Sequence, residues 1–83
     1  MTPEEKLQGE MWVKKRKQEL GLQMEQMRKE IGLGRFHFSE QGMHKAQVKN
    51  IEESRSNYTI EVLLTYLYHA GLDIEVKRRG NTP

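Results

Sequence analysis

The sequence predicts a small, mainly helical protein with one short strand near its C-terminal end. Several segments place apolar residues three or four positions apart, which is the period of an amphipathic helix. Gly32, Gly42 and Gly71 stand where such segments end, as glycine does after many helices. Residues 72–77 instead alternate apolar and charged side chains, as a strand with one buried face does. Together these observations predict a mainly α fold.

The composition excludes several classes of protein. A chain of 83 residues forms one domain with a thin core, and the absence of cysteine excludes disulfides and cysteine-based zinc sites. The N-terminus is acidic and polar, unlike a signal peptide, and the apolar runs are far too short to span a membrane. We therefore expect a soluble, cytoplasmic protein that is not bound to a membrane. The net charge of +2 permits nucleic-acid binding without demanding it.

Residues 2–20 begin with a strong helix start. Thr2 suits the capping position, Pro3 the first helical position, and two glutamates favour the positive end of the helix dipole. Gly21 is expected to end this helix, although a single bent helix running onward is the alternative. The basic run at residues 14–17 is expected to be a solvated helical face rather than a DNA contact.

Residues 22–31 predict a second helix, with Met24, Met27 and Ile31 on one face. Arg28 lies next to that face, where a charge needs a carboxylate partner. Residues 35–41 predict a short third helix, although two phenylalanines alternate there as in a strand. We favour the helix, because two short helices joined by a glycine turn form a helix-turn-helix motif.

Residues 44–53 predict the helix around which the chain is organised. Val48 and Ile51 are its only large apolar residues, and they form a narrow stripe on one side. Lys45, Lys49 and Asn50 face outward, and the small residue Ala46 leaves room for close approach. Such a helix fits the major groove of DNA, where lysine and asparagine read purine edges. An ordinary amphipathic surface helix is the alternative.

The last helix is expected to begin after Thr59 and to end at Gly71. Its expected buried stripe consists of Ile60, Leu63, Leu64 and Leu67, with Tyr66 beside it.

The strand that follows would present Leu72, Ile74 and Val76 on one face. Because the chain offers it no clear partner strand, we expect it to pair with the same strand of a second copy, which predicts a homodimer. Residues 80–83 are expected to be a flexible tail.

The order of these elements resembles the Cro/CI-type (XRE) helix-turn-helix family, which includes phage repressors and HipB- and HigA-like antitoxins. The matching residues are Met24, Met27, Arg28, Gly32 and Leu33, then Phe38–Glu40, then 42–52, then Thr59–Glu61 with Leu63 and Leu64. The resemblance covers roughly residues 22–72 and implies a lambda-repressor-like bundle. We therefore expect a helix-turn-helix DNA-binding domain with the C-terminal strand over residues 22–79. Residues 1–21 are expected to be a helical extension that has no counterpart in the core family. The C-terminal strand is similar to that of the small antitoxin-type members.

The resemblance also implies roles for individual residues. Arg28 and Glu52 would form a partly buried structural ion pair. The residues that would read DNA bases are Lys45, Ala46, Lys49 and Asn50. The residues that would bind DNA phosphates are Arg35, His44, Gln47 and Arg55.

The sequence therefore predicts a dimeric, sequence-specific regulator, most simply a repressor, that binds palindromic double-stranded DNA through residues 44–53. One alternative is an antitoxin, which would bind a toxin protein through the N-terminal helix and regulate its own gene. The other is a protein-interaction module that no longer binds DNA. We expect no enzyme, cofactor or metal site, because His37, His44 and His69 are scattered and no nucleophile has a positioned base.

Overall fold

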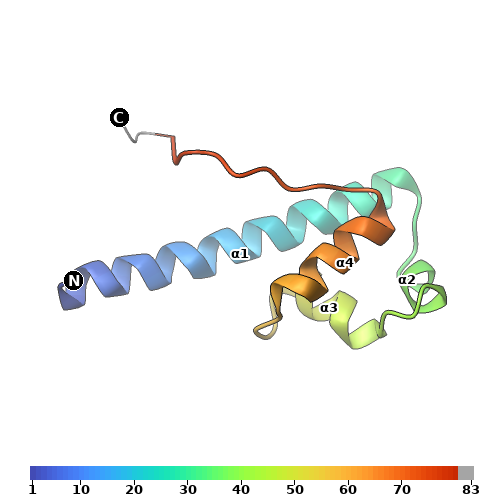
Figure 1. Cartoon of the computed structure of the whole chain (residues 1–83), viewed down its shortest axis with the longest axis horizontal. Coiled ribbons are helices and arrows are strands. Elements are labelled where there is room, and N and C mark those ends of the chain that lie inside the picture. The colour runs from blue at the N-terminus through green and yellow to red at the C-terminus, as the bar shows by residue number, and fades with distance from the viewer. Residues whose placement is uncertain (81–83) are drawn as a thin grey trace.

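The computed structural model describes residues 1–80, and within them lie four helices: α1 (Pro3–Ile31), α2 (Phe36–Glu40), α3 (Lys45–Glu53) and α4 (Ile60–Ala70). This confirms the mainly helical class. Figure 1 shows α2, α3 and α4 gathered beside the C-terminal half of α1, while the N-terminal half of α1 projects beyond them. The longest dimension of the molecule, 46 Å, therefore follows α1.

α1 begins where the first predicted helix begins and ends where the second predicted helix ends, and both ends have a local cause. The hydroxyl of Thr2 accepts a hydrogen bond from the Glu5 amide at 3.2 Å, and Pro3 opens the helix. Gly32 ends the helix with a φ of 91°, a conformation that costs glycine little. Its amide and that of Leu33 donate to the carbonyls of Lys29 and Arg28, so the last turn is closed.

Gly21 does not end a helix, so the prediction of a helix end there is wrong, and the alternative of one helix running onward is the observed one. It lies inside α1 and is buried against the last turn of α3. A Cβ atom at Gly21 would lie 2.6 Å from the carbonyl oxygen of Glu52 and 2.8 Å from that of Ile51. The glycine therefore lets the two helices approach closely. The predicted boundary between residues 1–21 and 22–79 accordingly falls within one continuous helix.

The core lies where α2, α3 and α4 meet α1. Phe38 and Tyr66 stack with their ring centroids 4.7 Å apart and their planes 9° from parallel. Val48 and Ile51, the stripe predicted for α3, are fully buried. The remaining buried hydrophobic residues are Met24, Met43, Leu63, Leu67 and Ala70.

The predicted buried faces of α1 and α4 are correct only in part. In α4 the buried positions are Leu63, Tyr66, Leu67 and Ala70, while Ile60 and Leu64 are exposed. The helix presents Tyr66 inward because its hydroxyl donates to the buried carboxylate of Glu52. In α1, Met24 is buried, whereas Met27 and Ile31 are exposed.

The segment between α1 and α3 is helical, which confirms the prediction for residues 35–41. Phe38 of α2 is fully buried, whereas Phe36 is 74% exposed. Gly42 makes the turn into α3 with a φ of 88°, which favours glycine. The amide of Met43 then donates to the carbonyl of Phe38 at 2.9 Å, and the buried Met43 side chain belongs to the hydrophobic core.

The C-terminal segment contains no strand in the described part of the chain, so the predicted strand is not observed. The segment runs beside α1 toward its N-terminal half (Figure 1). Leu72 is partly buried, whereas Ile74 and Val76 are exposed. A strand needs a neighbouring strand for its hydrogen bonds, and one copy of the chain supplies none. Of the predicted tail at residues 80–83, residues 81–83 lie outside the described residues.

None of the helices within residues 1–80 combines the length and the apolar character needed to cross a membrane.

Candidate nucleic-acid interface

The outer face of α3 carries the four residues predicted to read DNA bases. Lys45 and Ala46 are exposed, and Lys49 and Asn50 are partly exposed. The opposite face of the same helix is buried through Val48, Ile51 and Glu52. α3 is therefore held by one side and presents a mainly polar surface on the other.

The first turn of α3 places two of the predicted phosphate-binding residues beside that face. His44 precedes the helix in an extended conformation, and its amide donates to Oε1 of Gln47 at 3.0 Å. The oxygen of the Gln47 side chain thus accepts the capping hydrogen bond. The nitrogen of the same side chain carries two hydrogens that can be donated to another group. His44 is exposed. The positive end of the helix dipole makes this turn favourable for an anion.

A buried ion pair fixes α3 against α1. Nε of Arg28 lies 2.6 Å from Oε2 of Glu52, and Nη2 lies 3.0 Å from Oε1, so the pair is bidentate. The third guanidinium nitrogen donates to the carbonyl of Leu33 at 2.8 Å. Both charged side chains are almost completely buried. The structure thus contains the ion pair that the resemblance implies.

The surroundings of Glu52 keep it ionised although it is buried. Burial alone would raise the pKa of Glu52, but hydrogen bonds from Arg28, Tyr66 and Arg35 outweigh it and lower the pKa below its ordinary value. The hydrogen bond to Glu52 in turn raises the pKa of Arg28. Burial and the same carboxylate raise the pKa of Tyr66 well above that of a free tyrosine. In the described residues no buried side-chain nitrogen or oxygen lacks a partner, so the network is fully satisfied.

Arg35 belongs to this network and not to the surface predicted to hold phosphates. Its Nε donates to Glu52 at 3.1 Å, and its Nη2 lies 3.1 Å from Glu25 and 3.2 Å from Glu53. A guanidinium surrounded by three carboxylates is already neutralised, so we withdraw it from the phosphate-binding set. This arrangement is not visible in the sequence because the three glutamates come from two separate helices.

Arg55 lies in the loop after α3 and remains a candidate for a phosphate contact. Its side chain is 61% exposed, and its only ion pair within residues 1–80 is with Glu53 at 2.9 Å. An exposed pair of this kind contributes little to stability, and a phosphate can replace the glutamate at small cost.

The metal-binding types of side chain are spread over several elements in the described part of the chain. Within residues 1–80, no group of three or more metal-binding side chains is close enough to hold an ion. His37 instead places its Nε2 2.8 Å from the carbonyl of His69, which joins α2 to α4.

Comparison of the chain with protein-family models, curated proteins and solved structures gave no match. The roles assigned to the residues of α3 therefore rest on their position and chemistry.

Acid is expected to destabilise the protein through Glu52. Because the folded-state pKa of Glu52 is lowered, its contribution to stability is present above the unfolded-state pKa, near 4.5, and is lost as the pH falls through the folded-state value. Thermal unfolding from pH 7 to pH 3 should show a steeper fall in Tm for the wild type than for Glu52→Gln. Parallel curves for the two proteins would contradict this role of Glu52.

Sequence reasoning missed two features near this interface. It placed Tyr66 beside the buried stripe of α4 and not in contact with Glu52. It also did not group Lys6, Lys14 and Lys17, which line the same groove along α1. All three lie within the helix predicted for residues 2–20, and their spacing places them on one face of it.

Proposed function

We propose that the protein is a dimeric, sequence-specific DNA-binding regulator, and that each copy places α3 in a major groove. The observation that carries the proposal is the two-sided character of α3. One side is fixed by Val48, Ile51 and the buried Glu52, while the other presents Lys45, Ala46, Lys49 and Asn50. A recognition helix needs this combination, because base reading depends on a rigid helix whose polar face has no partner within the protein.

The contacts divide into two sets with different consequences. Asn50 and the two lysines carry groups that can hydrogen-bond base edges, and Ala46 allows close approach or contact with a thymine methyl group. His44, Gln47 and Arg55 lie at the two ends of α3, where they would hold phosphates on either side of the groove. The first set would determine sequence preference, and the second would supply affinity that depends on salt.

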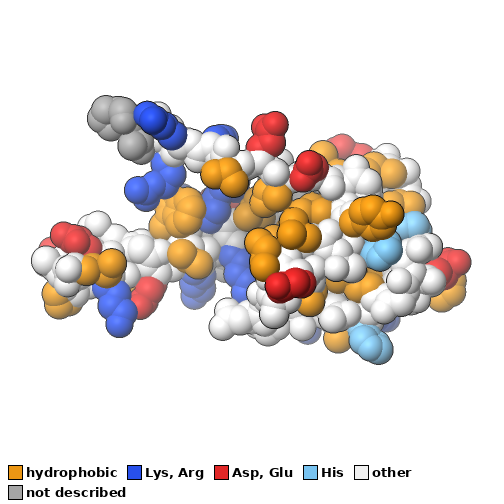
Figure 2. Space-filling model, viewed as in Figure 1, with side chains coloured by type: hydrophobic (Ala, Val, Ile, Leu, Met, Phe, Trp, Pro, Cys, Tyr) orange, Lys and Arg blue, Asp and Glu red, His pale blue; other side chains and the backbone are white. Residues whose placement is uncertain are grey.

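The proposed dimer forms through the C-terminal segment. Ile74 and Val76 are exposed in one chain, and together with Leu72 they alternate with charged residues. Figure 2 shows hydrophobic side chains gathered where this segment passes α1 and over the neighbouring face of α4. Pairing of two such segments would bury these residues and supply the missing hydrogen bonds. Two recognition helices would then read half-sites about one helical turn apart.

Replacing Asn50 by alanine is expected to relax sequence preference. The variant should lose about 1–3 kcal/mol of discrimination at one base position, while binding to unrelated DNA stays the same. The measurement is fluorescence anisotropy with a duplex selected from a random pool and with its single-base variants, at two salt concentrations. Arg55→Gln is the comparison, because a lost phosphate contact should weaken all duplexes equally. An Asn50→Ala variant that behaves like Arg55→Gln would exclude base reading by Asn50.

The antitoxin alternative is supported by a separate surface. Leu7, Met11, Trp12 and Val13 lie on the projecting half of α1 and are between 46% and 62% exposed. A toxin protein could cover these side chains, and DNA binding would then serve to regulate the gene that encodes the pair. Co-purification of the chain with the product of an adjacent gene, lost in a Leu7→Asp/Met11→Asp variant, would establish this function.

A further inference from the structure

The projecting half of α1 has a charged face that the proposed recognition helix does not explain. Residues 3–20 extend the helix by roughly 27 Å beyond Gly21, at about 1.5 Å per residue. In the C-terminal half of α1, Met24 and Arg28 are buried on one side of the helix. On the same side, the N-terminal half carries Lys6, Lys14 and Lys17. Figure 2 shows Lys and Arg side chains along the lower edge of this half. Glu10 and Val13 line the same part of the helix, so the lysines lie among an acidic and an apolar side chain.

This face forms one wall of a groove whose other wall is the loop between α3 and α4. The groove has a volume of about 520 Å³, and the loop contributes Ser54 and Asn57 to it. Lys17 joins the two walls, because its Nζ donates to the carbonyl of Ser56 at 2.5 Å and lies 4.9 Å from the ring centroid of Tyr58. The groove is therefore a defined feature between two connected elements.

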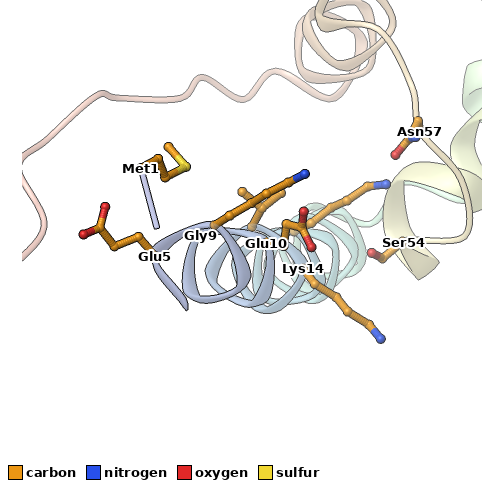
Figure 3. A pocket seen from close by; sticks show the side chains of 10 residues that line it. Met1, Glu5, Gly9, Glu10, Lys14, Ser54 and Asn57 are labelled. Carbon is orange, nitrogen blue, oxygen red and sulfur yellow. The ribbon is translucent and has the colours of Figure 1, made fainter. Parts of the chain in front are cut away.

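The charges in the groove suit an anionic ligand. Lys6 and Lys14 form no ion pair with any residue in 1–80. Glu5 and Glu10 also line the groove, so its lysines outnumber its glutamates by three to two. Figure 3 shows the Glu5 side chain directed away from the Ser54 and Asn57 side and the Glu10 carboxylate directed toward Ser54. In the same view the Lys14 side chain extends below Ser54. Free ammonium groups beside a hydroxyl and an amide are typical of surfaces that hold phosphate oxygens.

The groove is continuous with the end of α3. Ser54 is both the residue that caps α3 and a residue of the groove. Gly21 brings α1 directly against Ile51 and Glu52, so the projecting half of α1 begins beside the last turn of the recognition helix. A nucleic-acid strand that passes the end of α3 would next meet this groove.

We propose that the groove between α1 and the α3–α4 loop holds the sugar-phosphate backbone of duplex DNA that flanks the sequence read by α3. Lys6 and Lys14 supply the phosphate contacts, and Lys17 holds the loop wall in place. This inference rests on the proposed function and extends it, because it makes the footprint of each copy longer than the bases that α3 reads.

The test compares Lys6→Gln/Lys14→Gln with Lys15→Gln/Lys29→Gln. Lys15 and Lys29 lie on the same helix and are exposed but do not line the groove, so both variants lose the same charge. Lys17 is left intact because it holds the loop. Each protein is titrated by anisotropy over a range of salt concentrations, with a selected duplex trimmed to the α3 half-sites and with the same duplex carrying about ten further base pairs on each side, roughly one helical turn. Circular dichroism checks that both variants are folded.

The wild type and the control variant are expected to bind the longer duplex more tightly than the trimmed one. The groove variant should lose this preference, and its slope of log affinity against log salt should fall by about 1.8 per copy, at about 0.9 per phosphate contact. Equal slopes and an equal preference for the longer duplex in all three proteins would overturn the groove proposal and leave α3 as the reader. Binding of a labelled polyglutamate peptide that only the groove variant loses, with DNA titrations unchanged, would overturn it in favour of an acidic protein partner. A wild type that binds neither duplex at low salt would overturn the proposed function as well.

Discussion

Replacing Glu52 by glutamine is expected to destabilise the fold strongly. The substitution leaves Arg28 buried with an uncompensated charge, and breaking a buried pair in this way costs about 3–5 kcal/mol. Small domains are stable by only about 5–15 kcal/mol, so this loss is a large share of the total and should clearly lower the urea midpoint. Urea unfolding followed by circular dichroism measures the loss. DNA binding should fall in parallel, because α3 loses its attachment to α1 and α4.

The neighbouring residue provides a matched control. Glu53 pairs with Arg35 and Arg55 at the surface, so Glu53→Gln is expected to change stability by less than about 1 kcal/mol. An Arg28→Met/Glu52→Leu variant should be more stable than Glu52→Gln, because no buried charge is then left without a partner. Equal stability of Glu52→Gln and Glu53→Gln would show that the buried network does not hold α3.

Replacing Gly21 by alanine is expected to destabilise the protein, although alanine is the better helix former. The added Cβ would lie 2.6 Å and 2.8 Å from two backbone oxygens of α3, which cannot rotate away as a side chain can. Relief requires α1 and α3 to separate, and overpacking of this kind costs about 1–3 kcal/mol. The separation also stretches the bond between Arg28 and Glu52, so the loss should exceed the gain in helix propensity. Chemical unfolding measures the net change.

Gly9 is the matched control, because it lies in the same helix and a Cβ there would meet nothing within 4 Å. Gly9→Ala should therefore raise stability by about 0.5–1 kcal/mol through helix propensity alone. If Gly21→Ala stabilised the protein as Gly9→Ala does, the close approach of α1 to α3 would not exist in solution.

The sequence by itself determined the features that depend on neighbouring residues. The capping residues Thr2 and Thr59, the terminating glycines at 32 and 71, and the buried pair Val48 and Ile51 all follow from spacing within one segment. These features are local because a helix end or an apolar stripe is satisfied within a few turns. They were enough to predict a mainly helical chain and the polar outer face of α3.

Only the tertiary structure decided the features that join distant segments. Gly21 has the chemistry of a helix end, and its role as a contact became clear only when α3 was seen against it. Arg35 has the charge of a phosphate ligand but is enclosed by glutamates of α1 and α3. Tyr66 is buried because its hydroxyl has Glu52 as a partner from another helix. In each case the same side chain suits two environments, and the choice depends on which partner the packing of the helices brings within hydrogen-bonding or van der Waals distance.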